Sequence, residues 1–285
     1  MKLCRFRKPP DGPRVGLIQE DQTVLDLTFI GIERLTPLLE HDEPVRMLND
    51  LVLKNPPCCP MADVTLVTPV EHQEVWAAGV TYLRSKKARM DESDFSASAY
   101  DRVYDAARPE LFFKSLPEKV VSSGEAIGIR NDARWSVPEP ELALVVSSKG
   151  KIAGYTIGND MSSRDIEGEN TLYLPQAKVY HRSCAVGPVI EVGATESEAR
   201  TWKISVRITR GGQVQFQGET SVGQIKRAFG DLVEYLYRSQ RFPHGVVLLT
   251  GTGVVPPDDF SIQDGDDVTI AISGIGELRN RVVRV

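Results

Sequence analysis

Two glutamates stand two positions apart at the start of an apolar run, Pro138-Glu139-Pro140-Glu141-Leu142-Ala143-Leu144-Val145-Val146. In a β-strand, residues i and i+2 point to the same face, so these carboxylates should leave one side of the strand about 7 Å apart. Pro140 cannot donate a hydrogen bond to a neighbouring strand, which favours a strand end. A pair of solvated glutamates at a sheet edge is the plainer alternative, but the buried character of the run favours convergence on one cation.

A second polar stretch ends the next predicted strand, Gly154-Tyr155-Thr156-Ile157-Gly158-Asn159-Asp160-Met161-Ser162-Ser163-Arg164-Asp165. Asp160 lies at the end of this strand and can supply a third carboxylate. Magnesium, manganese and calcium prefer carboxylate and water oxygens. Three protein ligands would leave coordination positions for a substrate. Asp165 is expected to form a structural ion pair with Arg164 at the turn.

The rest of the chain reads mainly as short strands, which predicts a strand-rich α+β fold. The predicted strands are residues 64–67, 75–78, 142–146, 155–157, 204–208, 246–249 and 268–272. Two helices are predicted: residues 83–91, running toward residue 106 with a break, and residues 225–239, where apolar residues follow helical spacing.

The first 65 residues have a different pattern and predict a small α/β accessory domain. Short apolar runs at residues 14–18 and 23–27 precede helical stretches near residues 35–39 and 45–53. The segment Asn55-Pro56-Pro57-Cys58-Cys59-Pro60 cannot continue a helix and has the composition of a linker. The expected division is therefore an accessory domain at 1–65 and a catalytic domain at 66–285.

Several motifs in this order resemble the fumarylacetoacetate hydrolase superfamily over about residues 70–285. The motifs are Glu139-Pro140-Glu141, residues 159–165, Gln176-Ala177-Lys178 and Thr250-Gly251-Thr252-Gly253. The resemblance implies a mixed β-roll that assembles as a homodimer or homotetramer. It also implies a bound magnesium ion, or in its place manganese or calcium.

Carried onto this sequence, the resemblance assigns roles to individual residues. Glu139, Glu141 and Asp160 would bind the metal, Lys178 would lie beside the substrate keto oxygen, and Thr252 would bind a substrate carboxylate. Members that hydrolyse or decarboxylate carry an Asn-Tyr-x-x-His-x-x-Glu segment, whose histidine moves protons. The corresponding residues 79–92 contain no histidine, which argues against hydrolysis.

Two stretches look like the sugar-acid branch, which forms 2,5-dioxopentanoate from 2-keto-3-deoxy-D-arabinonate. They are Thr81-Tyr82 with Ala88-Arg89, and residues 166–180. This likeness implies a metal-dependent dehydratase, a hydro-lyase acting on a small 2-keto acid. Lys178 would move a proton or stabilise the enolate, and Glu167 or Glu169 would protonate the leaving hydroxyl. The implied substrate-binding residues are Thr81, Tyr82, Arg89, Arg164, Lys178 and Thr252.

Other readings stay open at the level of sequence. One keeps the fold and changes the chemistry to an acylpyruvate-type carbon–carbon hydrolase, an isomerase or an aldolase. The other is a non-catalytic ligand-binding protein that keeps the pocket. The net charge is −5 and the basic residues are scattered, so the sequence shows no basic patch that would bind nucleic acid or an anionic membrane. No segment predicts a signal peptide or a membrane span, so a cytoplasmic location is expected.

Overall fold

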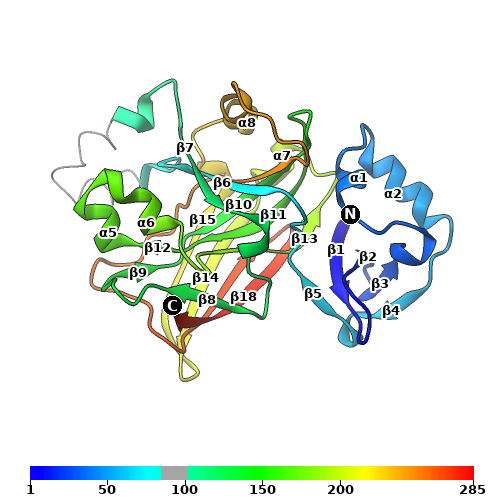
Figure 1. Ribbon diagram of the computed structural model, residues 1–285, viewed down its shortest axis with the longest axis horizontal. Helices are drawn as coiled ribbons and strands as arrows, with labels where there is room; N and C mark the ends of the chain where they lie inside the picture. Colours follow the sequence, from blue (N-terminus) through cyan, green and yellow to red (C-terminus); the bar gives the residue numbers. More distant parts are fainter. Residues whose placement is uncertain (85–101) are drawn as a thin grey trace.

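The structure is a computed structural model that describes residues 1–84 and 102–285. It has the strand-rich α+β architecture that the sequence predicts, with two sheets packed on each other and short helices at their margins (Figure 1). The amino-terminal strands and helices lie together at one end of the molecule (Figure 1).

Most of the described strands belong to one large sheet. They are β1 (Lys2–Arg7), β2 (Arg14–Ile18), β3 (Thr23–Asp26), β4 (Cys58–Pro60), β5 (Thr65–Val67), β6 (Glu74–Gly79), β7 (Glu110–Ser115), β10 (Pro140–Val146), β11 (Ile152–Asp160), β13 (Cys184–Glu191) and β16 (Val246–Leu249). Their order is β4-β3-β2-β1-β13-β11-β10-β16-β6-β7, and β5 pairs with β1 beside this path. The pairing is antiparallel except between β16 and β6.

A second sheet covers one face of the large one. Its strands are β8 (Ala126–Ile129), β14 (Lys203–Arg210), β15 (Gln213–Ser221), β17 (Asp267–Ile272) and β18 (Gly276–Arg284). They follow the order β15-β14-β17-β18-β8. Two short strands, β9 (Ser136–Val137) and β12 (Ser162–Ser163), pair separately.

The described helices are short, and several are single 3-10 turns. They are η1 (Leu27–Ile30), α1 (Thr36–Leu39), α2 (Pro44–Val52), η2 (Met61–Asp63), η3 (Pro117–Lys119), α5 (Arg164–Glu169), η4 (Thr171–Tyr173), α6 (Leu174–Lys178), α7 (Glu196–Ala199), η5 (Val222–Gln224) and α8 (Phe229–Tyr237). In residues 1–84 and 102–285, no helix is long and apolar enough to cross a membrane.

The predicted strands all overlap observed ones, namely β5, β6, β10, β11, β14, β16 and β17. The helix predicted at 225–239 is shorter, because α8 begins only at Phe229. The guanidinium group of Arg200 donates hydrogen bonds to the carbonyls of Ile225 and Arg227, at 3.0 and 2.8 Å, and so holds the preceding residues extended. The helix predicted at 83–91 lies almost wholly outside the described residues.

The main hydrophobic core lies between the two sheets. Alternate residues of facing strands enter it, among them Leu142, Leu144 and Val146 of β10, Ile204, Val206 and Ile208 of β14, and Val268, Ile270 and Ile272 of β17. Burial of each such side chain contributes about 2 kcal/mol. Since side chains alternate along a strand, Glu141 and Ala143 of β10 lie on the opposite face of the large sheet.

The amino-terminal segment is joined to the rest through β1, which pairs with β2, β5 and β13. A second hydrophobic cluster contains Leu3, Leu17 and Leu38 of this segment together with Val145 and Ile190 of the large sheet. The division of the chain at residue 65 stays a prediction.

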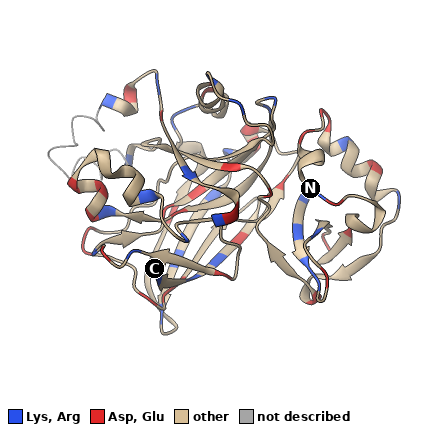
Figure 2. Ribbon diagram, viewed as in Figure 1, with Lys and Arg blue, Asp and Glu red and all other residues tan. Residues whose placement is uncertain are grey.

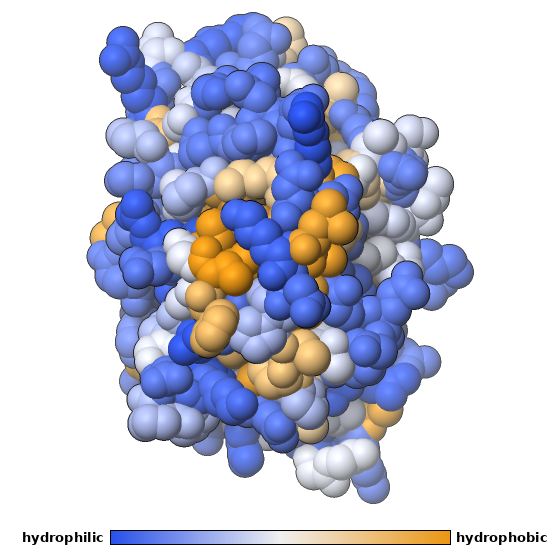
Figure 3. Space-filling model, turned by 90° about the vertical axis from the view of Figure 1, so that its right-hand side faces the viewer, coloured by the Kyte–Doolittle hydropathy of each residue, from blue (hydrophilic) through white to orange (hydrophobic). Residues whose placement is uncertain are grey.

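Charged residues of both signs are distributed along the whole chain. Figure 2 shows acidic and basic residues interspersed in both halves of the molecule. The end formed by the amino-terminal segment is mostly hydrophilic and has an apolar patch near its centre (Figure 3). In this segment Phe29 and Leu53 are largely exposed, so neither adds to the core.

A buried carboxylate fastens α1 to the sheet. Glu71 accepts hydrogen bonds from the backbone N–H groups of Leu35 and Thr36, both at 2.9 Å, and from the Thr36 hydroxyl at 2.7 Å. Arg5 Nε lies 3.7 Å from the same carboxylate. Bonds to a charged acceptor are stronger than neutral ones, so this contact should stabilise the amino-terminal segment.

We therefore expect Glu71→Ala to lower the free energy of unfolding by about 3 kcal/mol, because buried N–H groups lose their acceptor and Arg5 loses its counter-charge. Urea denaturation of the metal-free protein measures this loss. Glu118→Ala removes an exposed carboxylate on η3 and serves as the control, with an expected change within about 0.5 kcal/mol. A loss below about 1 kcal/mol for Glu71→Ala would contradict the fastening role.

Candidate metal centre and active site

Three carboxylates meet where β10 begins and β11 ends. The two strands are antiparallel, with Glu141 opposite Gly158, and the Asp160 N–H donates a hydrogen bond to the Glu139 carbonyl at 3.1 Å. Glu139, Glu141 and Asp160 each offer one oxygen, and these oxygens lie within 4.8 Å of one another. All three side chains are buried. The structure thus brings the three predicted ligands together around one point.

The loop after β16 positions the side chain of Glu141. Oε2 of Glu141 accepts a hydrogen bond from the Gly251 N–H at 2.5 Å. Gly251 has a φ of +90°, and a Cβ at this position would lie 2.2 Å from Thr81 Oγ1, so only glycine fits. Thr81 donates its hydroxyl proton to the Thr250 carbonyl at 2.6 Å. Thr81 therefore supports the loop that holds the ligand.

Lys178, the last residue of α6, lies against two of the carboxylates. Its Nζ is 2.9 Å from Glu139 Oε1 and 3.2 Å from Asp160 Oδ2. Lys178 also donates a hydrogen bond of 2.5 Å to the Ser162 hydroxyl, which lies 2.9 Å from Glu139 Oε1. Ser162 was not predicted as a site residue, although it belongs to the motif that contains Asp160.

Arg164 and Glu167 extend the buried network from α5. Arg164 Nη2 lies 3.0 Å from Glu139 Oε1, and its Nη1 lies 3.8 Å from Glu167 Oε2. Asp165, in contrast, accepts a hydrogen bond from the Arg134 N–H at 2.7 Å. The structure therefore pairs Arg164 with a predicted metal ligand, and Asp165 with the segment before β9.

A second lysine lies beneath the carboxylates. Lys114 of β7 is completely buried, and its Nζ lies 2.5 Å from Asp160 Oδ1. It also donates hydrogen bonds to the carbonyls of Met161, at 3.0 Å, and of Lys178. Lys114 was not predicted from the sequence. The available signal was a single lysine after the apolar residues Leu111, Phe112 and Phe113.

The electrostatics of the site favour a bound cation. The buried network has four carboxylates and three cationic groups, which leaves one excess negative charge: Glu139, Glu141, Asp160 and Glu167 with Lys114, Arg164 and Lys178. Burial, with the nearby charges of Asp160 and Glu139, raises the pKa of Glu141 well above the ordinary glutamate range. A divalent ion would relieve this penalty, and the all-oxygen donor set fits magnesium or manganese.

A narrow cavity opens beside this network. It is lined by Ala78, Gly79, Val80, Glu110, Phe112, Glu139, Asp160, Glu167, Lys178, Gly251 and Thr252. Glu110 of β7 was not predicted, and its carboxylate lies so close over Gly79 that a Cβ on Gly79 would be 2.0 Å from Glu110 Oε2. The lining includes Glu167, whereas Glu169 is exposed and is not among the described lining residues.

The remaining predicted residues occupy different places. Thr252 lines the cavity, and its hydroxyl lies 3.3 Å from the Val254 carbonyl. Tyr82 is buried, and its hydroxyl has no hydrogen-bond partner among the described residues. Burial, with a smaller effect of Glu141, raises the Tyr82 pKa. Arg89 lies outside the described residues.

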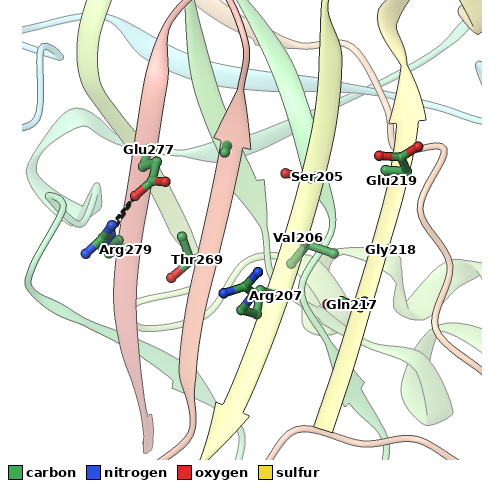
Figure 4. Close-up of a pocket in the computed structure, with 10 residues that line it drawn as sticks. Ser205, Val206, Arg207, Gln217, Gly218, Glu219, Thr269, Glu277 and Arg279 are labelled. Carbon is green, nitrogen blue, oxygen red and sulfur yellow. Dashed lines mark hydrogen bonds and ion pairs between the residues drawn. The ribbon is translucent and has the colours of Figure 1, made fainter. Parts of the chain in front are cut away.

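A much larger hollow lies elsewhere, on the outer face of the second sheet (Figure 4). It measures about 610 Å³, against about 20 Å³ for the cavity beside the carboxylates. Its lining consists of the outward side chains of β14, β15, β17 and β18, among them Arg207, Glu219 and Thr269, and an ion pair between Glu277 and Arg279. It lacks the buried, convergent acidic groups of the smaller cavity. We therefore identify the smaller cavity as the candidate active site from its side chains, although its volume is smaller.

Comparison with known proteins identifies the class. Residues 74–283 match the family described as Fumarylacetoacetate (FAA) hydrolase C-terminal. The chain belongs to the fumarylacetoacetate hydrolase family, which confirms the resemblance found in its motifs.

Two of the similar proteins and one of the similar structures are dehydratases of 2-keto-3-deoxy sugar acids. The chain is 48% identical over 217 residues to the probable 2-keto-3-deoxyxylonate dehydratase of Haloferax volcanii, covering 76% of this chain and 74% of that protein. It is 42% identical over 219 residues to the 2-dehydro-3-deoxy-D-arabinonate dehydratase of Saccharolobus solfataricus, with the same coverage. A structure of 2-keto-3-deoxy-D-arabinonate dehydratase complexed with magnesium and 2,5-dioxopentanoate aligns with a TM-score of 0.83 and 35% identity, covering 100% of this chain and 99% of that one.

Because the pKa of Glu141 is raised, we expect magnesium binding to expel a proton from this carboxyl group. The affinity for Mg²⁺ should therefore rise with pH up to this raised pKa, because protons compete with the metal. For folding, the relevant interval lies between the ordinary glutamate pKa of about 4.3 and the raised pKa. In the same interval the folded protein holds more protons than the unfolded chain, so the metal-free protein should lose stability as pH rises.

Titration calorimetry of the metal-free protein at several pH values, in buffers of different ionisation enthalpy, measures this proton release. Thermal unfolding with and without Mg²⁺ measures the stability. An Mg²⁺ affinity that does not change with pH would rule out the expected linkage.

Proposed function

We propose that this protein is a magnesium-dependent dehydratase of a 2-keto-3-deoxy sugar acid, such as the conversion of 2-keto-3-deoxy-D-arabinonate to 2,5-dioxopentanoate. The observation that carries the proposal is the convergence of the buried side chains of Glu139, Glu141 and Asp160 beside Lys178, at the edge of a narrow cavity. The similarity to two sugar-acid dehydratases, and to a related enzyme structure containing magnesium and 2,5-dioxopentanoate, supports it.

The reaction removes one water molecule and rearranges the remaining hydrogen atoms. Loss of the C3 proton and the C4 hydroxyl group forms water and a double bond between C3 and C4. Transfer of one hydrogen from C5 to C3, and of the C5 hydroxyl hydrogen to C4, then yields the terminal aldehyde. A bound divalent ion would supply Lewis acidity at the C2 carbonyl, which makes the C3 proton easier to remove.

Residues of the chain would carry the proton transfers. Lys178 lines the cavity and lies beside the ligands, which supports its predicted role in accepting the C3 proton or stabilising the enolate. Glu110 and Glu167 are the carboxylates in the lining other than the proposed ligands, so we propose one of them as the acid for the C4 hydroxyl. The exposure of Glu169 favours these two over it. Thr252, with the glycine-flanked loop, would bind the C1 carboxylate.

The alternatives have less support. Hydrolysis needs a group that activates water, and residues 79–92 offer no histidine for this task. His181, which is near the motif in sequence, is exposed. A non-catalytic binding protein would not need the buried lysine and carboxylates beside the cavity. The cytoplasmic location and the homodimeric or homotetrameric assembly stay predictions.

The reaction class is tested by incubating the purified enzyme and Mg²⁺ with 2-keto-3-deoxypentonates of different configuration. We expect 2,5-dioxopentanoate, detected through its terminal aldehyde group, and loss of activity on treatment with a chelator. Release of pyruvate would instead indicate carbon–carbon cleavage. Metal binding without any turnover across the panel would favour a binding protein.

The ligand role is tested by Glu141→Gln, which keeps the side-chain volume and removes the charge. We expect kcat to fall by at least about 100-fold at saturating Mg²⁺, because the transition state loses metal stabilisation. The metal-free variant should unfold at no lower temperature than the wild type, because glutamine is neutral like the protonated carboxyl group and its amide oxygen can accept the hydrogen bond from Gly251. Glu118→Gln, the same change at an exposed position on η3, should leave both values unaltered. Near wild-type turnover of Glu141→Gln would contradict the role of Glu141 as a metal ligand.

The acid is identified by comparing Glu110→Gln and Glu167→Gln. Loss of the proton donor should lower kcat by about 10²–10⁴-fold with a smaller effect on KM. The descending limb of the pH profile should disappear in the variant that lacks the acid. If both variants keep their kcat and pH profile, neither carboxylate is the acid.

A further inference from the structure

Lys114 is held inside the protein by three contacts. It is 0% exposed, and its ammonium group contacts Asp160 Oδ1, the Met161 carbonyl and the Lys178 carbonyl. The ammonium group donates hydrogen bonds to the two carbonyls and forms an ion pair with Asp160 Oδ1. Two acceptors are backbone atoms, at the end of β11 and the end of α6, which gives Lys114 no room to follow a moving carboxylate.

The position of Lys114 restricts how Asp160 can bind a cation. One oxygen, Oδ1, faces Lys114 at 2.5 Å, whereas Oδ2 faces Lys178 at 3.2 Å. A cation that took both oxygens would have to displace Lys114, which is completely buried. Asp160 is therefore held in an orientation that offers Oδ2 alone.

Glu141 is restricted in a similar way. Its Oε2 accepts the hydrogen bond from the Gly251 N–H, a rigid backbone donor. A site whose carboxylates each give one oxygen suits a small octahedral ion that keeps positions for water and substrate. Calcium takes six to eight oxygens at longer distances and often binds carboxylates through both oxygens.

We propose that Lys114 is a specificity-determining residue for the metal: by holding Asp160 Oδ1, it prevents two-oxygen binding and so selects magnesium over calcium. The inference rests on the metal site of the proposed function and adds to it a residue that does not itself touch the ion. Removal of a positive charge would change the affinity for every divalent ion by a similar factor. The ratio of the Mg²⁺ and Ca²⁺ affinities therefore isolates the geometric effect from the electrostatic one.

The test is Lys114→Met, which keeps a long side chain and removes the charge and the donors. Calorimetric titration of the metal-free protein with Mg²⁺ and with Ca²⁺ gives the two dissociation constants. We expect the affinity ratio to shift toward Ca²⁺ by at least about 10-fold, a size typical of changes to groups behind metal ligands. Lys119→Met makes the same change at an exposed position after β7 and should leave the ratio at its wild-type value.

The outcomes separate this inference from the proposed function. A wild-type protein that binds neither ion would overturn both. A variant that binds both ions with the wild-type ratio would overturn only the role of Lys114. If Lys114→Met does not fold, wild-type crystals soaked with Mn²⁺ decide the matter: Asp160 bound through one oxygen, with Oδ1 still on Lys114, is the expected result, and binding through both oxygens would overturn it.

Discussion

The mutual repulsion of three buried carboxylates is the constraint on which the site depends. Glu139, Glu141 and Asp160 are nearly inaccessible to water, and together with Glu167 these carboxylates outnumber the cationic groups of Lys114, Lys178 and Arg164 by one. Such an arrangement is costly without a cation and favourable with one. The stability of the two packed sheets offsets this cost. The apolar core lies on one side of β10, and the acidic groups lie at the start of this strand.

Much of the fold could be predicted because its signals are local. Short β-rich runs predicted seven of the strands, and the spacing of Glu139 and Glu141 placed both carboxylates on one face without any knowledge of distant residues. Asp160 followed from the next strand of the same hairpin. The role of Lys178 came from a resemblance rather than from spacing, because nothing local to α6 shows what lies opposite its side chain.

The parts that could not be predicted come from long-range pairing. Glu110 and Lys114 reach the site because β7 pairs with β6, and Gly251 reaches Glu141 because β16 pairs with β10. The sequence of β7 does not indicate which strand β7 will pair with. The start of α8 was misplaced for a related reason: residues 225–228 have helical spacing, but hydrogen bonds from Arg200, a residue distant in sequence, hold them extended.

The place of β1 between β2 and β13 has a consequence for how the polypeptide acquires its shape during synthesis. The hairpin of β1 and β2 can close as soon as it leaves the ribosome, and residues 5–7 on the other edge of β1 pair with the nearby β5. Lys2, Leu3 and Cys4 on that edge must wait for Cys184–Glu191. Contacts so far apart in sequence slow folding, because a long loop has to close before they form. Until then this part of β1 presents an unpaired edge, which is the feature of a nascent chain that chaperones shield from aggregation.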